Sequence, residues 1–84
     1  MSDITIRVRL FAGLREAAGW SQQEVSLPAG AAVADLLAQI EQTTPDLILR
    51  GRPVYAAVNQ QYVERDYPLG DGDEVALFPP VSGG

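Results

Sequence analysis

The residues with the clearest chemical potential are the last seven of the chain, Phe78-Pro79-Pro80-Val81-Ser82-Gly83-Gly84. The two prolines fix φ near −65° and stiffen the start of this tail. Gly83 and Gly84 lack a Cβ, so they restore freedom and can pass through a narrow channel. Seven extended residues reach roughly 20 Å, which would carry the Gly84 carboxylate well inside another protein. The other interpretation is a frayed terminus, because chain ends are commonly disordered.

Composition excludes most side-chain chemistry. The chain has no Cys and no His, so thiolates and the commonest metal ligands and acid–base groups are missing. All six basic residues are Arg, which removes Schiff-base and phosphate chemistry based on Lys. Asp71-Gly72-Asp73 indicates a tight turn rather than a metal loop, since further ligands at EF-hand spacing do not follow. No nucleotide-binding glycine motif is present, so we expect this chain to bind no cofactor. If the protein takes part in covalent chemistry, its terminal carboxylate is the best candidate for the reacting group.

Length and charge narrow the classes of partner. Eighty-four residues predict a single domain over residues 1–84, with residues 79–84 as its tail. A net charge of −5 argues against nucleic-acid binding and favours partners with basic surfaces. No apolar run approaches the ~18 residues of a membrane span, and no signal-peptide pattern opens the chain. We therefore expect a cytoplasmic protein that does not enter a membrane.

Alternating hydrophobic residues predict the strands that carry the tail. Ile4, Ile6, Val8 and Leu10 share one face of the first strand, while Phe11 falls on the opposite, polar face. The same alternation, bounded by turn residues, marks the later strands. The predicted strands are 4–11, 22–27, 54–58, 62–63 and 74–78.

Two helical segments are predicted between these strands. Residues 13–18 form a short helical turn that Gly19 ends, and Arg15 in it is either a solvated helix residue or a functional one. Residues 33–42 form the main helix, whose apolar stripe is Val33, Leu36, Leu37 and Ile40. Its start is weak, because alanines occupy the capping positions and only Asp35 favours the helix dipole. Leu47, Ile48 and Leu49 are expected to close the core beneath it.

This order of elements predicts an α+β fold of the ubiquitin-like β-grasp type. Its parts are one mixed five-stranded sheet, one main helix across a face, and a flexible Gly-Gly tail at the C-terminus. A right-handed crossover places the first and last strands side by side, which brings Phe11 and Phe78 together on the open face. Exposed aromatic residues on one face favour a partner surface. Two unrelated surface aromatics are the alternative.

Two segments carry a family resemblance. Phe11-Ala12-Gly13-Leu14-Arg15-Glu16, and the run from Pro68 to Ala76 that continues into the Phe-Pro-Pro-Val-Ser-Gly-Gly ending, resemble the small subunit of molybdopterin synthase. This is the MoaD branch of the MoaD/ThiS ubiquitin-like sulfur carriers. The thiamine-pathway carrier shares the fold and the Gly-Gly end but typically lacks the Pro-Pro pair. The uncapped helix and the absence of Lys depart from the family pattern.

The resemblance implies a role in molybdenum cofactor biosynthesis. An adenylating enzyme of the MoeB type would use ATP to join Gly84 to AMP, and a sulfur donor protein would convert the adenylate into a thiocarboxylate. The tail would insert into the large, MoaE-type subunit, which supplies the catalytic groups. Sulfur would pass to cyclic pyranopterin monophosphate (precursor Z) to build the dithiolene. This chain would then be a non-catalytic sulfur donor. The family suggests a heterotetramer, although the residues leave the number of copies open.

The resemblance also implies roles for individual residues. It places Phe11, Tyr62 and Phe78 in the hydrophobic contact with both partners, and Val81, Ser82 and Gly83 in the channel of the large subunit. We expect further partner contacts from Arg15, Pro79 and Pro80. Two other classes stay open: a protein modifier that is conjugated to lysines, and an interaction module whose tail is inert.

Overall fold

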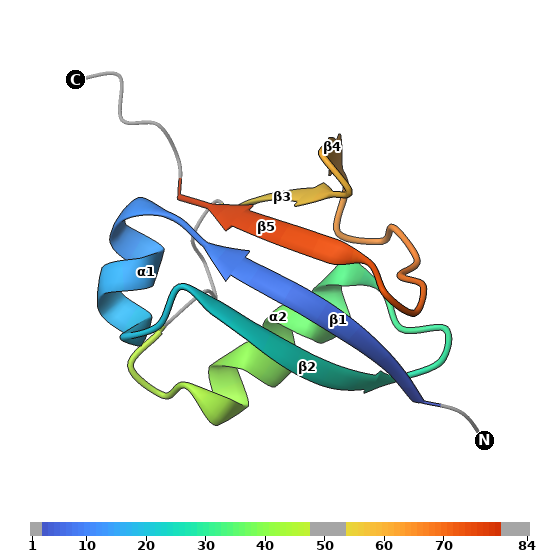
Figure 1. Ribbon diagram of the computed structural model, residues 1–84, viewed down its shortest axis with the longest axis horizontal. Helices are drawn as coiled ribbons and strands as arrows, with labels where there is room; N and C mark the ends of the chain where they lie inside the picture. The colour runs from blue at the N-terminus through green and yellow to red at the C-terminus, as the bar shows by residue number, and fades with distance from the viewer. Residues whose placement is uncertain (1–2, 48–53, 80–84) are drawn as a thin grey trace.

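The computed structural model describes residues 3–47 and 54–79 (Figure 1). Strands and helices alternate along the first half of the chain, and three further strands follow. The elements are β1 (Asp3–Leu10), α1 (Ala12–Ala18), β2 (Gln22–Pro28), α2 (Val33–Thr43), β3 (Tyr55–Val58), β4 (Gln61–Val63) and β5 (Glu74–Phe78). Every predicted strand and helix is present, with bounds that differ from the prediction by at most one residue.

The five strands form one mixed sheet in the order β2-β1-β5-β3-β4. β1 runs parallel to β5 and antiparallel to β2, and β3 pairs antiparallel with both β5 and β4. The predicted adjacency of the first and last strands is therefore confirmed. Because the two run parallel, the end of β1 and the end of β5 reach the same edge, where Leu10 pairs with Leu77.

The core lies between the sheet and α2, which crosses behind β1 and β2 in Figure 1. The alternating residues of β1 that were predicted to point inward are all buried. They pack with Val33, Leu36, Leu37 and Ile40 of α2, and with Val75 and Leu77 of β5. Each such side chain contributes about 1.5–3 kcal/mol relative to an exposed one. Leu47 is buried as predicted, whereas Ile48 and Leu49 lie outside the described residues.

Helix α2 begins without a capping side chain, as predicted, but its first N–H groups have other partners. Asp35 Oδ2 accepts the Ala32 N–H at 2.8 Å, which is half of a capping box, since an alanine has no side-chain acceptor to complete it. The backbone carbonyls of Tyr67 and Arg65 accept the N–H groups of Val33 and Ala34 at 3.0 and 2.9 Å. A tertiary contact thus supplies the cap that the local sequence lacks. No helix in the described ranges is long and apolar enough to cross a bilayer.

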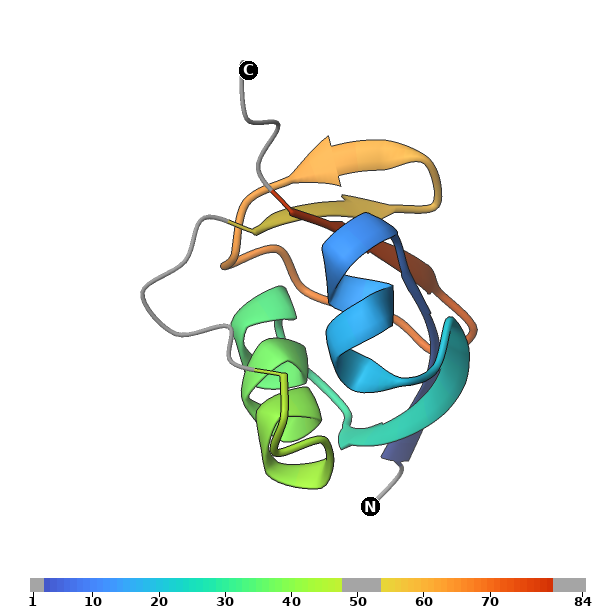
Figure 2. The same cartoon turned by 90° about the vertical axis from the view of Figure 1, so that its left-hand side faces the viewer.

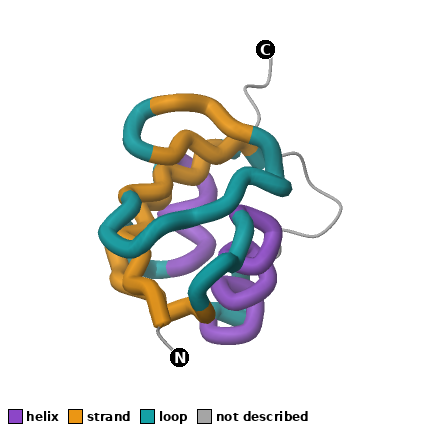
Figure 3. The backbone as a smooth tube through the Cα atoms, turned by 90° about the vertical axis from the view of Figure 1, so that its right-hand side faces the viewer, coloured by secondary structure: helices purple, strands orange, loops and turns teal. Residues whose placement is uncertain are grey.

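The loop before β5 is closed by side-chain hydrogen bonds to the backbone, at the end of the molecule seen in Figure 3. Asp71 Oδ1 accepts the Thr5 N–H at 2.8 Å, and Asp73 Oδ2 accepts the Gly70 N–H at 2.8 Å. Asn59 donates from Nδ2 to Asp73 Oδ1 at 2.9 Å and accepts the Glu74 N–H on its Oδ1 at 3.1 Å. The predicted tight turn at 71–73 is confirmed, with Gly72 in the left-handed region at φ 86°.

Candidate functional site

A pair of stacked rings marks the place where the tail leaves the sheet, at the end viewed in Figure 2. The ring centroids of Phe11 and Phe78 are 4.7 Å apart, with 13° between the ring planes. The parallel register causes this contact: Leu10 pairs with Leu77, so the next residue of each segment lies beside the other. Offset stacking at this distance is a favoured arrangement of aromatic rings. The predicted proximity of Phe11 and Phe78 is confirmed.

One detail of that prediction is wrong. Phe11 was assigned to the first strand, but β1 ends at Leu10 and Phe11 is the N-cap residue of α1. Its backbone is still extended, at φ −127° and ψ 152°, so its side chain continues the alternation of the strand. The alternation could not reveal that the chain turns into a helix at the next residue. Both rings are half-buried, which leaves part of each face accessible.

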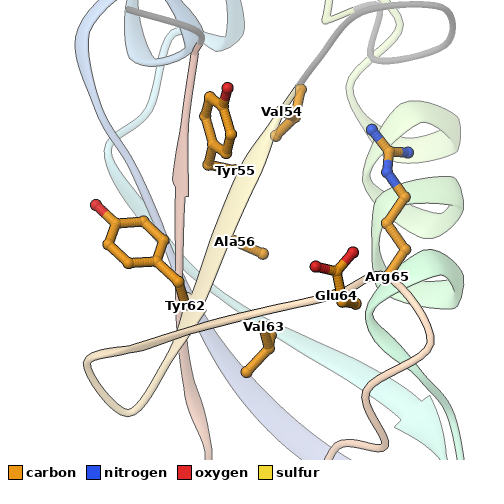
Figure 4. A pocket seen from close by; sticks show the side chains of 7 residues that line it. All are labelled: Val54, Tyr55, Ala56, Tyr62, Val63, Glu64 and Arg65. Atoms are coloured by element: carbon orange, nitrogen blue, oxygen red, sulfur yellow. The ribbon is translucent and has the colours of Figure 1, made fainter.

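Tyrosines extend the aromatic surface across the sheet. The Tyr62 ring centroid lies 6.1 Å from that of Phe78, tilted by 49°, and Tyr62 is 74% exposed. We call Phe11, Phe78 and Tyr62 the aromatic row. Tyr55 pairs with Phe78 in the β3–β5 register and is 51% exposed. Figure 4 shows Tyr55 and Tyr62 projecting to the same side of β3 and β4. The sequence reading missed Tyr55, because it treated residues 54–58 as an apolar interior strand.

A shallow hollow lies behind this part of the sheet (Figure 4). Tyr55 and Tyr62 form part of its lining. The remaining lining residues are Val54, Ala56, Val63, Glu64 and Arg65. The lining is mainly apolar, with one acidic and one basic side chain. This composition offers mainly packing surface.

A cation lies at the Phe11 end of the aromatic row. The guanidinium carbon of Arg9 is 5.6 Å from the Phe11 ring centroid, within the range of a cation–π contact. Arg9 Nη1 is 3.8 Å from Glu74 Oε2, and the two side chains are 47% and 35% exposed. An exposed pair at this separation stabilises the fold little. Arg9 was not among the predicted site residues, because an Arg on a polar strand face gives no functional signal in sequence.

Of the other predicted site residues, the structure describes only Arg15 and Pro79. Arg15 is exposed on α1, and its side chain makes no hydrogen bond or ion pair with another residue of the described ranges. Pro79 is half-buried directly after Phe78. Five predicted residues lie outside the described residues, namely Pro80, Val81, Ser82, Gly83 and Gly84. Within residues 3–47 and 54–79, no cluster of three or more acidic, His or Cys side chains could hold a metal ion.

Sequence comparisons point to a single family. The ThiS family model matches residues 8–84. The chain is 46% identical over 81 residues to the molybdopterin synthase sulfur carrier subunit of Chlamydomonas reinhardtii, covering 94% of this chain and 98% of that protein. It is 44% identical over 82 residues to the protein of the same name from Escherichia coli, covering 94% and 99%.

Solved structures confirm the ubiquitin-like β-grasp fold. Small archaeal modifier protein 1 of Haloferax volcanii matches with a TM-score of 0.84 and 32% identity over 95% of this chain and 99% of that one. A chain in the complex of subunits 1 and 2 of the Helicobacter pylori molybdopterin-converting factor matches with a TM-score of 0.67 and 27% identity, covering 96% and 100%. A ubiquitin of Caldiarchaeum subterraneum, 15% identical with a TM-score of 0.64 over 99% of this chain and 100% of that one, shares the fold alone.

Proposed function

Because the chain belongs to the ThiS/MoaD family, we propose that it is the sulfur carrier subunit of a molybdopterin synthase and acts in molybdenum cofactor biosynthesis. The observation that carries the proposal is the match of nearly the whole chain, tail included, to proteins that bear this name. The aromatic row supports it independently, since it offers a partner a docking surface at the end of the strand that precedes the tail.

The proposed chemistry takes place at the carboxylate of Gly84. A carboxylate is a poor electrophile, so an adenylating enzyme of the MoeB type first joins it to AMP and releases pyrophosphate from ATP. A sulfur donor protein then supplies the sulfur that displaces AMP, which leaves a terminal thiocarboxylate. Because activation consumes ATP, we place these steps in the cytoplasm. The lack of Cys supports this route, since the chain has no thiol that could carry a persulfide.

Sulfur then passes from Gly84 to cyclic pyranopterin monophosphate. The chain has no Cys, His or Lys, so we assign the catalytic groups to the large subunit. Val81, Ser82 and Gly83 are proposed to lie in the channel of that subunit. Glycine before the terminus suits a narrow channel, because it carries no side chain.

The aromatic row is the proposed docking surface for the large subunit. Phe11 and Phe78 are half-buried and Tyr62 is mostly exposed, so a partner can still cover a large part of their area. Buried aromatic side chains are the usual anchors of protein interfaces. The complex of subunits 1 and 2 in the Helicobacter pylori protein supports a partner of this kind. We place Arg15 and Pro79 at the rim of the same surface, and Pro80 where the tail enters the partner.

Intact mass spectrometry tests the proposal most directly. The protein would be isolated from cells that contain the activating pathway, and the same protein without Gly84 would serve as the control. We expect replacement of one oxygen by sulfur, located at the C-terminus by fragmentation and absent from the control. An unmodified C-terminus, together with no sulfur transfer to cyclic pyranopterin monophosphate in the presence of the large subunit, would refute the assignment.

A protein modifier is the second candidate, because the chain shares its fold and 32% of aligned residues with small archaeal modifier protein 1 of Haloferax volcanii. A modifier would form amide bonds between Gly84 and lysines of target proteins. Epitope-tagged protein in cells should separate the two candidates. Covalent target adducts that persist under denaturing conditions, and vanish when Gly84 is deleted, would favour the modifier.

A further inference from the structure

Arg9 holds a particular position beside the proposed docking surface. It projects from the open face of β1, two residues before Phe11 and in register with Ala76 of β5. Its guanidinium lies over the Phe11 ring and near Glu74. The two contacts place the guanidinium at the edge of the aromatic row, so a partner that covers the Phe11 ring on this side also covers Arg9.

The guanidinium brings unused hydrogen-bond donors to that surface. It carries five N–H donors, and its 3.8 Å approach to Glu74 is longer than a hydrogen bond. Within residues 3–47 and 54–79, the side chain of Arg9 donates no hydrogen bond. In the free chain these donors can hydrogen-bond to water, because the side chain is 47% exposed.

Docking would remove this water. If a charged donor loses its bound water and gains no acceptor, the free-energy cost of its desolvation strongly disfavours binding. The near neighbours on the side of the aromatic row are Phe11, Ala76 and Phe78, whose side chains accept nothing. On the other side, Gln22 pairs with Arg9 in the β1–β2 register and Glu74 is 3.8 Å away, and neither accepts a hydrogen bond from the guanidinium. An acceptor on the partner would therefore replace the water that docking removes.

We infer that Arg9 is a specificity-determining residue of the docking surface, and that the partner surface covering Phe11 and Phe78 places a carboxylate against its guanidinium. The inference rests on the proposed function, which makes the large synthase subunit the partner. A carboxylate fits best, because its two oxygens match the planar fork of a guanidinium and the resulting bonds are charge-assisted. Glu74 leaves room for this pairing, since it touches Arg9 on one nitrogen only.

The charge distribution supports a local acidic contact on an otherwise basic partner. The strand residues of the open face include Arg7 and Arg9 against Asp3, Glu24 and Glu74, a net charge of −1, whereas the whole chain has a net charge of −5. Most of the acidic excess thus lies on other surfaces, where it would attract a basic partner over a distance. The acidic group opposite Arg9 would instead fix the register of the bound complex.

Calorimetric titration with the purified large subunit tests the inference. Arg9→Met keeps an apolar side chain over Phe11 but removes the charge and the donors, and Arg9→Lys restores the charge without the planar fork. Arg7→Met is the matched control, because it lies on the same face two residues earlier. We expect Arg9→Met to weaken binding about tenfold or more and Arg9→Lys to recover part of the loss. Arg7→Met should change affinity by less than about threefold.

Salt dependence and charge reversal sharpen the test. Affinity of the unmodified protein should fall between about 0.05 and 0.5 M NaCl by a larger factor than that of Arg9→Met. Arg9→Glu should bind poorly, and exchange of the opposing carboxylate of the large subunit for Arg should restore binding. Equal or tighter binding by Arg9→Met would overturn the inference. If Phe78→Ala still weakened binding in that case, the docking surface itself would stand; if neither variant weakened it, the docking surface would fail as well.

Discussion

The two ends of β5 are held in different ways. At its start, Asp73 and Asn59 bond to each other and to the backbone at Gly70 and Glu74. At its end, Phe78 is held by the rings of Phe11 and Tyr62. At the polar end, these donors and acceptors are paired with one another within the fold. The aromatic end leaves area that water still covers.

This difference separates structural from functional surface. Donors and acceptors that are already paired gain little from a partner, because new contacts would have to replace existing ones. Half-buried rings can still gain free energy when a partner removes water from them. The start of β5 is therefore suited to fixing the strand, and its end to binding, close to the point where the tail begins.

Deletion of Gly84 is expected to have the largest effect on function. It removes the proposed reacting carboxylate from its place, so sulfur transfer in a reconstituted synthase should be abolished. Gly83→Val should also fail, because its side chain would clash in the channel and restrict φ. The unfolding midpoint of both variants should equal that of the unmodified protein, since neither residue belongs to the described core. Full activity of either variant would count against a chemical role for the tail.

Phe78→Ala should weaken binding to the large subunit by about 2 kcal/mol or more, roughly thirtyfold in Kd, because it removes the central ring of the aromatic row. Calorimetry would measure the change. Ser26→Ala provides the control, since Ser26 is exposed on the distant strand β2. If the two variants bound equally well, the aromatic end would have no special part in docking.

Asp73→Ala should lower the stability of the fold and leave binding to the large subunit unchanged. It removes the acceptors of the Gly70 N–H and of Asn59 Nδ2, so the free energy of unfolding should fall by about 1–2 kcal/mol. Urea denaturation would measure this loss. Asp66→Ala makes the same change of charge on an exposed loop residue and should alter stability by less than about 0.5 kcal/mol. Weaker binding by Asp73→Ala under conditions where it is fully folded would contradict the separation of the two ends.

The sequence predicted the aromatic end better than the polar end. Parallel pairing of the first and last strands follows from element order, and it fixes the meeting of Phe11 and Phe78. The partners of Asp71 and Asp73 are 66 and 14 residues away in the chain, at Thr5 and Asn59, and no local pattern encodes such distances. For the same reason, the sequence could not predict that the carbonyls of Arg65 and Tyr67 cap α2. Arg9 was missed because its significance depends on the neighbours that the fold brings to it.

The smallest expected effect is the coupling between the two ends. Asp73 and Phe78 are five residues apart along an extended strand, roughly 16 Å, and substitutions at that distance usually add. Among the described residues, the side-chain contact that joins the ends is the exposed ion pair between Glu74 and Arg9. Pairs of this kind contribute about 0–1 kcal/mol.

The double variant Asp73→Ala with Phe78→Ala measures this coupling. Its loss of unfolding free energy should equal the sum of the single losses within about 0.5 kcal/mol. Its affinity for the large subunit should match that of Phe78→Ala alone, because we place the partner contacts at the aromatic end. A coupling above about 1 kcal/mol would mean that the hydrogen bonds at the start of β5 also order the rings at its end. The two ends would then form one cooperative unit, and binding of the partner at the aromatic end would also stabilise the hydrogen bonds at the start of β5.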